Sequence, residues 1–63
     1  MYAHLHPGTR VRLIRMTDLH TDLRPGAEGS VTGWHDVSGL AVDWDSGSKL
    51  SVLPDAGDRV EVI

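Results

Sequence analysis

The chain has 63 residues, a formal net charge of −3 and no cysteine. We expect a single domain over residues 1–63, in which residues 1–6 form a loose lead-in. The lack of cysteine excludes disulfides and thiolate zinc sites, and it favours a cytoplasmic location. No apolar run approaches the roughly 20 residues that cross a membrane, and no secretion signal is found, so we expect no membrane contact.

The first half of the chain predicts a strand followed by a long loop. In residues 9–15, Val11 and Leu13 point to one side and charged residues lie between them, which is the period of a half-buried strand. Residues 16–24 are polar and irregular, and they predict a loop. Two leucines in this loop have the spacing of one helical face, so a short helix remains an alternative.

The rest of the chain predicts four more strands. Residues 27–35 follow a proline-glycine turn, and the two glycines inside this strand predict a bulge or a sharp bend. Residues 40–45 alternate cleanly and place Trp44 on the apolar face, which predicts that this tryptophan belongs to the core. A short glycine-containing loop then leads to strands at residues 49–53 and 60–62.

Five short strands joined by glycine-rich turns predict an all-β protein. We expect an SH3-like small five-stranded antiparallel β-barrel with a long loop between its first two strands. A barrel that is this small bends its strands sharply, which the glycines inside the second strand permit.

The chain carries four motifs in a fixed order over residues 2–63. They are Gly8-Thr9-Arg10-Val11-Arg12-Leu13-Ile14-Arg15-Met16, Pro25-Gly26-x-x-Gly29-x-Val31, Val42-x-Trp44-Asp45-x-Gly47-Ser48-x-Leu50 and Leu53-Pro54. This ordered set resembles the family called domain of unknown function 4314. The resemblance implies a small SH3-like barrel of the kind found in short bacterial and phage proteins, without an established activity. The Gly-x-x-Gly-x-Val turn also resembles the start of KOW-type motifs in ribosome- and transcription-associated barrels.

Catalytic and cofactor motifs are missing from the sequence. No Ser-His-Asp arrangement and no phosphate-binding glycine loop is found, and a chain this short has little room for a deep cleft beside its core. We therefore expect that the protein is not an enzyme and holds no cofactor. His4 and His6, with His20 or His35, could bind zinc or nickel, but their spacing fits no closed site and we interpret them as exposed side chains without a metal.

Candidate binding residues are of two kinds. Arg10, Arg12 and Arg15 of the first strand, with Lys49 nearby, could contact phosphates, although acids across the sheet could equally neutralise them. Trp34 would anchor a protein partner or a nucleobase if it is exposed, and the sequence leaves its orientation open.

The sequence favours a non-catalytic binding module. Open strand edges and surplus apolar residues predict contact with another protein, or self-association into a homo-oligomer. The alternative is binding of RNA or single-stranded nucleic acid through the arginine-bearing first strand. The surplus apolar residues are Ile14, Leu19, Leu23, Val37 and Leu53.

Overall fold

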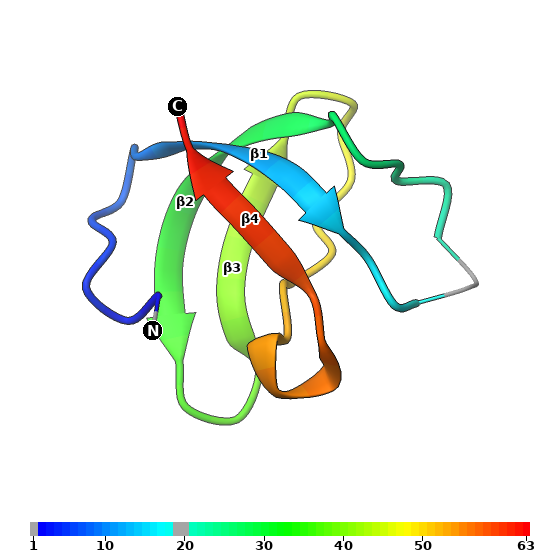
Figure 1. The fold of residues 1–63 in the computed structure, drawn as a ribbon. Coiled ribbons are helices and arrows are strands. Elements are labelled where there is room, and N and C mark those ends of the chain that lie inside the picture. The colour runs from blue at the N-terminus through cyan, green and yellow to red at the C-terminus, as the bar shows by residue number, and fades with distance from the viewer. Residues whose placement is uncertain (1, 19–20) are drawn as a thin grey trace.

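The computed structural model describes residues 2–18 and 21–63, and that part of the chain forms one curved antiparallel sheet (Figure 1). The sheet order is β3-β2-β1-β4. The described residues contain a short 3-10 helix but no α-helix, which confirms the all-β prediction. The elements are β1 (Arg10–Arg15), β2 (Glu28–His35), β3 (Gly39–Trp44), η1 (Pro54–Ala56) and β4 (Arg59–Val62).

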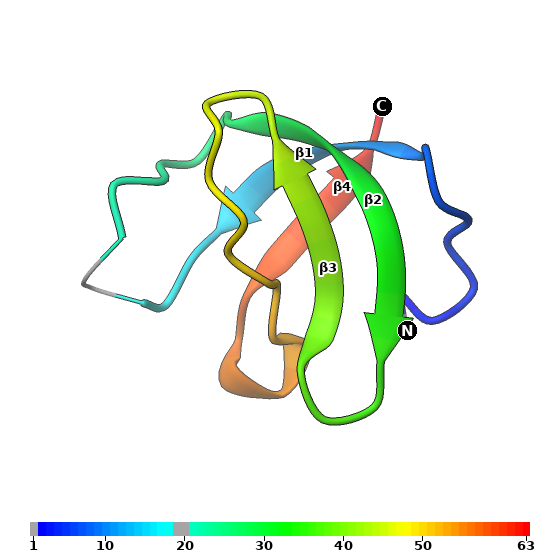
Figure 2. The same ribbon diagram turned by 180° about the vertical axis from the view of Figure 1, so that it is seen from behind.

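Strand β2 bends strongly, so that the sheet curls around its apolar side (Figures 1 and 2). The register between β2 and β3 shifts between Val31 and Gly33, where β2 carries one residue more than its partner. This bulge confirms the prediction made from the internal glycines. Nearer the start of β2, Gly29 faces β3 so closely that a Cβ atom there would lie 2.8 Å from the Asp43 carbonyl oxygen.

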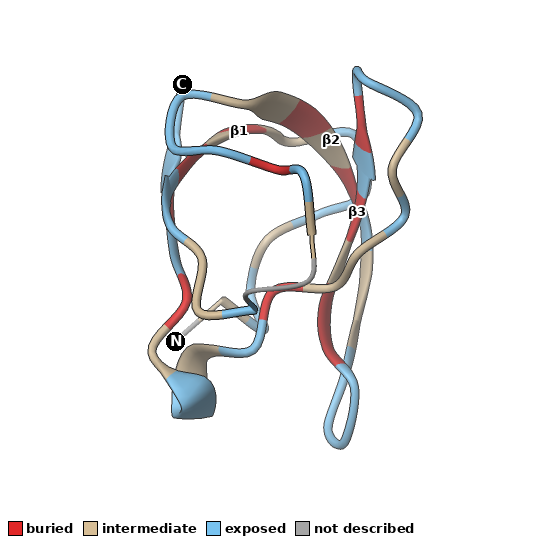
Figure 3. Ribbon diagram, turned by 90° about the vertical axis from the view of Figure 1, so that its right-hand side faces the viewer, coloured by how far each residue is buried: buried red, intermediate tan, exposed pale blue. Residues whose placement is uncertain are grey.

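The core lies on the inner side of the curled sheet, and Figure 3 shows buried residues on the strands and on the segments between them. Trp44 is 1 % exposed, as predicted, and its indole Nε1 donates a hydrogen bond to the Leu50 carbonyl at 2.8 Å. The apolar core residues are Val11, Leu13, Leu23, Val31, Leu40, Val42, Trp44, Val52 and Val60.

The expected strand at residues 49–53 is not formed, so the described sheet has four strands instead of five. Val52 makes one isolated bridge to Leu40, with both backbone hydrogen bonds present at 2.8 and 2.9 Å. On either side of this bridge the next backbone groups do not pair with β3. The Leu50 carbonyl accepts from the Trp44 indole, and Pro54 has no N–H to donate, so the ladder does not continue.

Segments outside the sheet also differ from expectation. Tyr2 and Leu5, in the region expected to be a loose lead-in, pack against the core. Leu23, expected to be a surplus apolar residue, is only 5 % exposed because the long loop folds back over the core. The described residues of that loop form no helix, and Leu19 and His20 lie outside the described part. No helix in residues 2–18 and 21–63 is long and apolar enough to cross a membrane.

Candidate functional site

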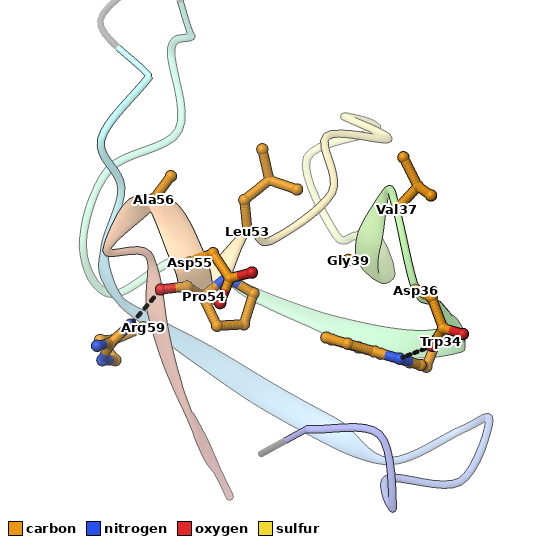
Figure 4. Close-up of a pocket in the computed structure, with 9 residues that line it drawn as sticks. All are labelled: Trp34, Asp36, Val37, Gly39, Leu53, Pro54, Asp55, Ala56 and Arg59. Carbon is orange, nitrogen blue, oxygen red and sulfur yellow. Dashed lines mark hydrogen bonds between the residues drawn. The ribbon is translucent and has the colours of Figure 1, made fainter.

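The candidate site is an open groove at one end of the sheet, between the β2–β3 turn and η1 (Figure 4). These two segments lie next to each other in both ribbon views (Figures 1 and 2). The groove has a volume of about 480 Å³. It is lined by Trp34, Asp36, Val37, Gly39, Leu53, Pro54, Asp55, Ala56 and Arg59.

The bulge in β2 places Trp34 in this groove. In an unbulged strand, side chains alternate, so Trp34 would lie on the opposite face from Val31. The extra residue reverses this parity, and Trp34 pairs with Leu40, whose side chain is buried in the core. Trp34 therefore packs against the end of the core and stays half-buried, and its Nε1 donates a hydrogen bond to Asp36 Oδ1 at 3.1 Å.

A glycine allows the two walls of the groove to approach. Gly39 begins β3 with φ +83°, a backbone conformation that side chains with a Cβ rarely adopt. A Cβ atom there would collide with the Val52 carbonyl oxygen and would lie 3.0 Å from Leu53 Cδ2. The turn that carries Val37 can therefore sit directly beside Leu53 only because residue 39 is glycine.

Asp58 holds the η1 wall in place. This aspartate is 2 % exposed, and its carboxylate accepts hydrogen bonds from the Thr17 N–H (2.8 Å), the Thr17 hydroxyl (2.6 Å) and the Leu53 N–H (2.9 Å). Burial alone would raise the pKa of Asp58, but these hydrogen bonds and the charge of Arg59 together lower it. The carboxylate thus ties the start of η1 to the segment after β1.

The groove combines exposed apolar side chains with two carboxylates, those of Asp36 and Asp55. Val37 is 93 % exposed and Leu53 is 40 % exposed. Within the described residues, neither Asp36 nor Asp55 forms an ion pair. Arg59 also lines the groove, but its guanidinium donates to the Pro54 carbonyl (3.0 Å) and the Asp58 carbonyl (2.7 Å).

The predicted phosphate-contacting residues lie elsewhere, mostly paired with carboxylates on the outer face of the sheet. Arg10 binds Asp45 through two hydrogen bonds of 2.8 and 2.6 Å, which lower the pKa of Asp45 and raise that of Arg10. Arg12 lies 3.0 Å from Glu61 and 3.5 Å from Glu28.

Lys49 belongs to the same outer surface, since it lies 2.8 Å from Asp43 of β3. Arg15 stands apart at the end of β1, exposed and in register with Arg59. The structure therefore does not bring Arg15, Lys49 and Trp34 together into one site.

The histidines show no metal centre in the part of the chain that the structure describes. His4, His6 and His35 are exposed, and no group of at least three potential ligands is found among residues 2–18 and 21–63. His20 lies outside this part.

Several residues of the candidate site are not identified by sequence reasoning. The sequence marks Val37 and Leu53 only as surplus apolar residues, and Asp36 and Asp55 look like ordinary turn residues. The available sequence signal for a groove is an apolar residue within one glycine-containing turn, Val37, and another directly before a second such turn, Leu53. Nothing in the sequence separates Asp58 from the other acids, because its burial depends on segments distant along the chain.

A comparison with models of protein families shows which family the chain belongs to. Residues 2–63 match the family described as "Domain of unknown function (DUF4314)". The chain belongs to this family. The DUF4314 match spans the region over which the sequence motifs resembled it, so that resemblance is confirmed. The searches of curated proteins and of solved structures each found no match.

Proposed function

We propose that this DUF4314 chain is a non-catalytic module that binds another protein through the groove between the β2–β3 turn and η1. The observation that carries the proposal is the exposure of Val37 and Leu53 in a groove that a half-buried tryptophan also lines. Aromatic residues in such positions are frequent anchors of protein interfaces. Covering apolar surface with a partner removes it from water, which lowers the free energy of the complex.

The proposal includes the SH3-like barrel as the interpretation of the fold. It is supported by the order of a long loop, a hairpin turn between β2 and β3, a 3-10 helix and a last strand that returns to β1. The bridge between Leu40 and Val52 supports it too, because it brings residues 49–53 alongside β3. A cytoplasmic location also belongs to the proposal, and the absence of cysteine supports it.

Charge favours a protein partner over a nucleic acid. Arg10, Arg12 and Lys49 are each within 4 Å of a carboxylate, so a phosphate would have to compete with an existing ion pair. The groove itself carries two carboxylates that would repel a phosphate backbone. Binding of nucleic acid through the first strand therefore remains the alternative that the experiment must distinguish.

Affinity capture with groove variants tests the proposal. Immobilised wild-type protein should retain a partner from an extract of the source cell, and Val37→Asp or Leu53→Ser should lose it, because each removes exposed apolar surface from the groove. Ile14→Asp is the matched control, since Ile14 is 46 % exposed and does not line the groove.

Three outcomes contradict the proposal. Equal retention by wild type and groove variants places the contact elsewhere. Loss of the retained material after nuclease treatment identifies nucleic acid as the partner. A concentration-dependent dimer in sedimentation that Val37→Asp abolishes identifies the occupant as a second copy of the chain.

A further inference from the structure

We infer that the segment bound in the groove presents an aliphatic side chain next to a lysine or arginine. The inference rests on the proposed function and specifies the chemistry of its partner. A volume of about 480 Å³ lies within the usual range of roughly 300–1,000 Å³ for sites that take small ligands. The groove therefore accepts a few side chains of a short segment.

The apolar walls of the groove indicate that the bound segment contributes an aliphatic side chain. Val37 on the β2–β3 turn and Leu53 before η1 offer exposed apolar surface, and the Pro54 ring and the Trp34 indole add to it (Figure 4). Trp34 already donates its only polar hydrogen to Asp36, so the indole offers the partner an apolar and aromatic surface.

The distribution of charge over the molecule indicates that the partner carries a positive side chain. The carboxylates of the outer face each have an Arg or Lys within 4 Å, whereas Asp36 and Asp55 have none among the described residues. Figure 4 shows Asp36 beside Trp34 on one wall of the groove and Asp55 beside Pro54 on the other. A positive side chain entering the groove from solvent would find a carboxylate partner on either wall.

Arg59 does not supply that missing charge. Its guanidinium is held by two backbone carbonyls, and its charge contributes to keeping the pKa of Asp58 low. The hydrogen bond from Trp34 occupies Oδ1 of Asp36 and leaves Oδ2 to accept from a cation. The arrangement pairs one fixed carboxylate with an aromatic ring, and a guanidinium or ammonium group can interact with both.

Titration of the full chain with three eight-residue peptides tests the inference. The peptides share a Gly/Ser background and differ in one adjacent pair, which is Leu-Arg, Leu-Glu or Ser-Arg. The readout is the indole N–H signal of Trp34 in a nitrogen–proton NMR spectrum. Trp44 serves as the internal reference, because its indole is buried and bonded to a backbone carbonyl.

We expect the Leu-Arg peptide to shift the Trp34 signal and leave the Trp44 signal in place. Asp36→Asn and Asp55→Asn should each weaken binding about two- to five-fold, the size expected for an exposed ion pair, and 0.5 M salt should weaken it too. Asp22→Asn is the matched control, because Asp22 is exposed and does not line the groove.

The contradicting outcomes distinguish an error in the chemistry of the bound segment from an error in the proposed protein binding. If the Leu-Glu peptide shifts the Trp34 signal as much as the Leu-Arg peptide does, the partner does not need a cation. If the Ser-Arg peptide shifts it as much, the partner does not need an aliphatic side chain. If no peptide shifts Trp34 at 10 mM, the partner chemistry is wrong as a whole. The proposed function is decided independently, by whether Val37→Asp abolishes capture of the natural partner.

Discussion

Replacement of Asp58 by asparagine should destabilise the protein by about 2–3 kcal/mol. The asparagine oxygen can still accept both hydrogen bonds from Thr17, but its amide group would face the Leu53 N–H, so a donor meets a donor. A buried hydrogen bond to a charged group contributes roughly 1.5–3 kcal/mol, and the site is closed to water that could replace it. At roughly 0.05–0.15 kcal/mol per residue, the 63-residue chain has about 3–9 kcal/mol of total stability.

Urea unfolding followed by tryptophan fluorescence measures the effect, because the buried Trp44 becomes exposed when the core opens. The matched variant is Thr17→Val, which removes only the hydroxyl bond and keeps the backbone bond to Asp58. It should cost about 1.5 kcal/mol, less than Asp58→Asn. If Asp58→Asn unfolds within about 0.5 kcal/mol of the wild type, the carboxylate does not hold the η1 wall.

The difference between wild type and Asp58→Asn should also depend on pH. The folded-state pKa of Asp58 is lowered below the ordinary value of about 3.9, so the carboxylate contributes its full stability above that pH. The contribution is lost as the pH falls through the folded pKa. A difference in unfolding free energy that stays constant from pH 7 to pH 2 would refute the reasoning.

Three further changes test other parts of the structure. Tyr2→Phe removes a hydroxyl that binds both the N–H and the carbonyl of one residue on the free edge of β4, so it should cost about 1 kcal/mol and increase self-association in sedimentation. Unchanged unfolding with a strict monomer would argue against this role. Gly29→Ala should destabilise by about 1–3 kcal/mol in urea because the new methyl group meets β3 at 2.8 Å, whereas Gly33→Ala, with nothing within 4 Å, should change little. Similar unfolding midpoints for the two variants would contradict the close contact. Arg10→Gln should raise the pKa of Asp45 towards its ordinary value in an NMR titration, and an unchanged pKa would show that the pair does not persist in solution.

Alternation of apolar residues was sufficient to locate most of the sheet. Val11 and Leu13 in β1 are buried as predicted, and so is Trp44 in β3, because one face of each strand must leave water. The same signal failed at residues 49–53. There, two apolar side chains reach the core, but the Leu50 carbonyl accepts from the Trp44 indole and Pro54 has no N–H, so the side chains are buried without a ladder.

The groove was harder to predict than the sheet. Gly33 indicated a bulge, but only the register shows that the extra residue turns Trp34 towards the core side. The arginines of β1 were correctly placed on one strand, yet whether acids neutralise them depends on cross-strand neighbours such as Asp45 and Glu61. Such pairings join residues far apart in the chain, which local patterns do not encode.

The central position of β1 has a consequence for how the chain reaches its native state. This strand is flanked by β2 and by β4, and the Tyr2 hydroxyl bonds to a backbone 58 positions away. Bringing such distant residues together costs chain entropy before the stabilising contacts form. Folding should therefore be slow for a chain of this size. Neither the N-terminal nor the C-terminal half can assemble the sheet alone, and the molecule should gain or lose its structure in a single cooperative step.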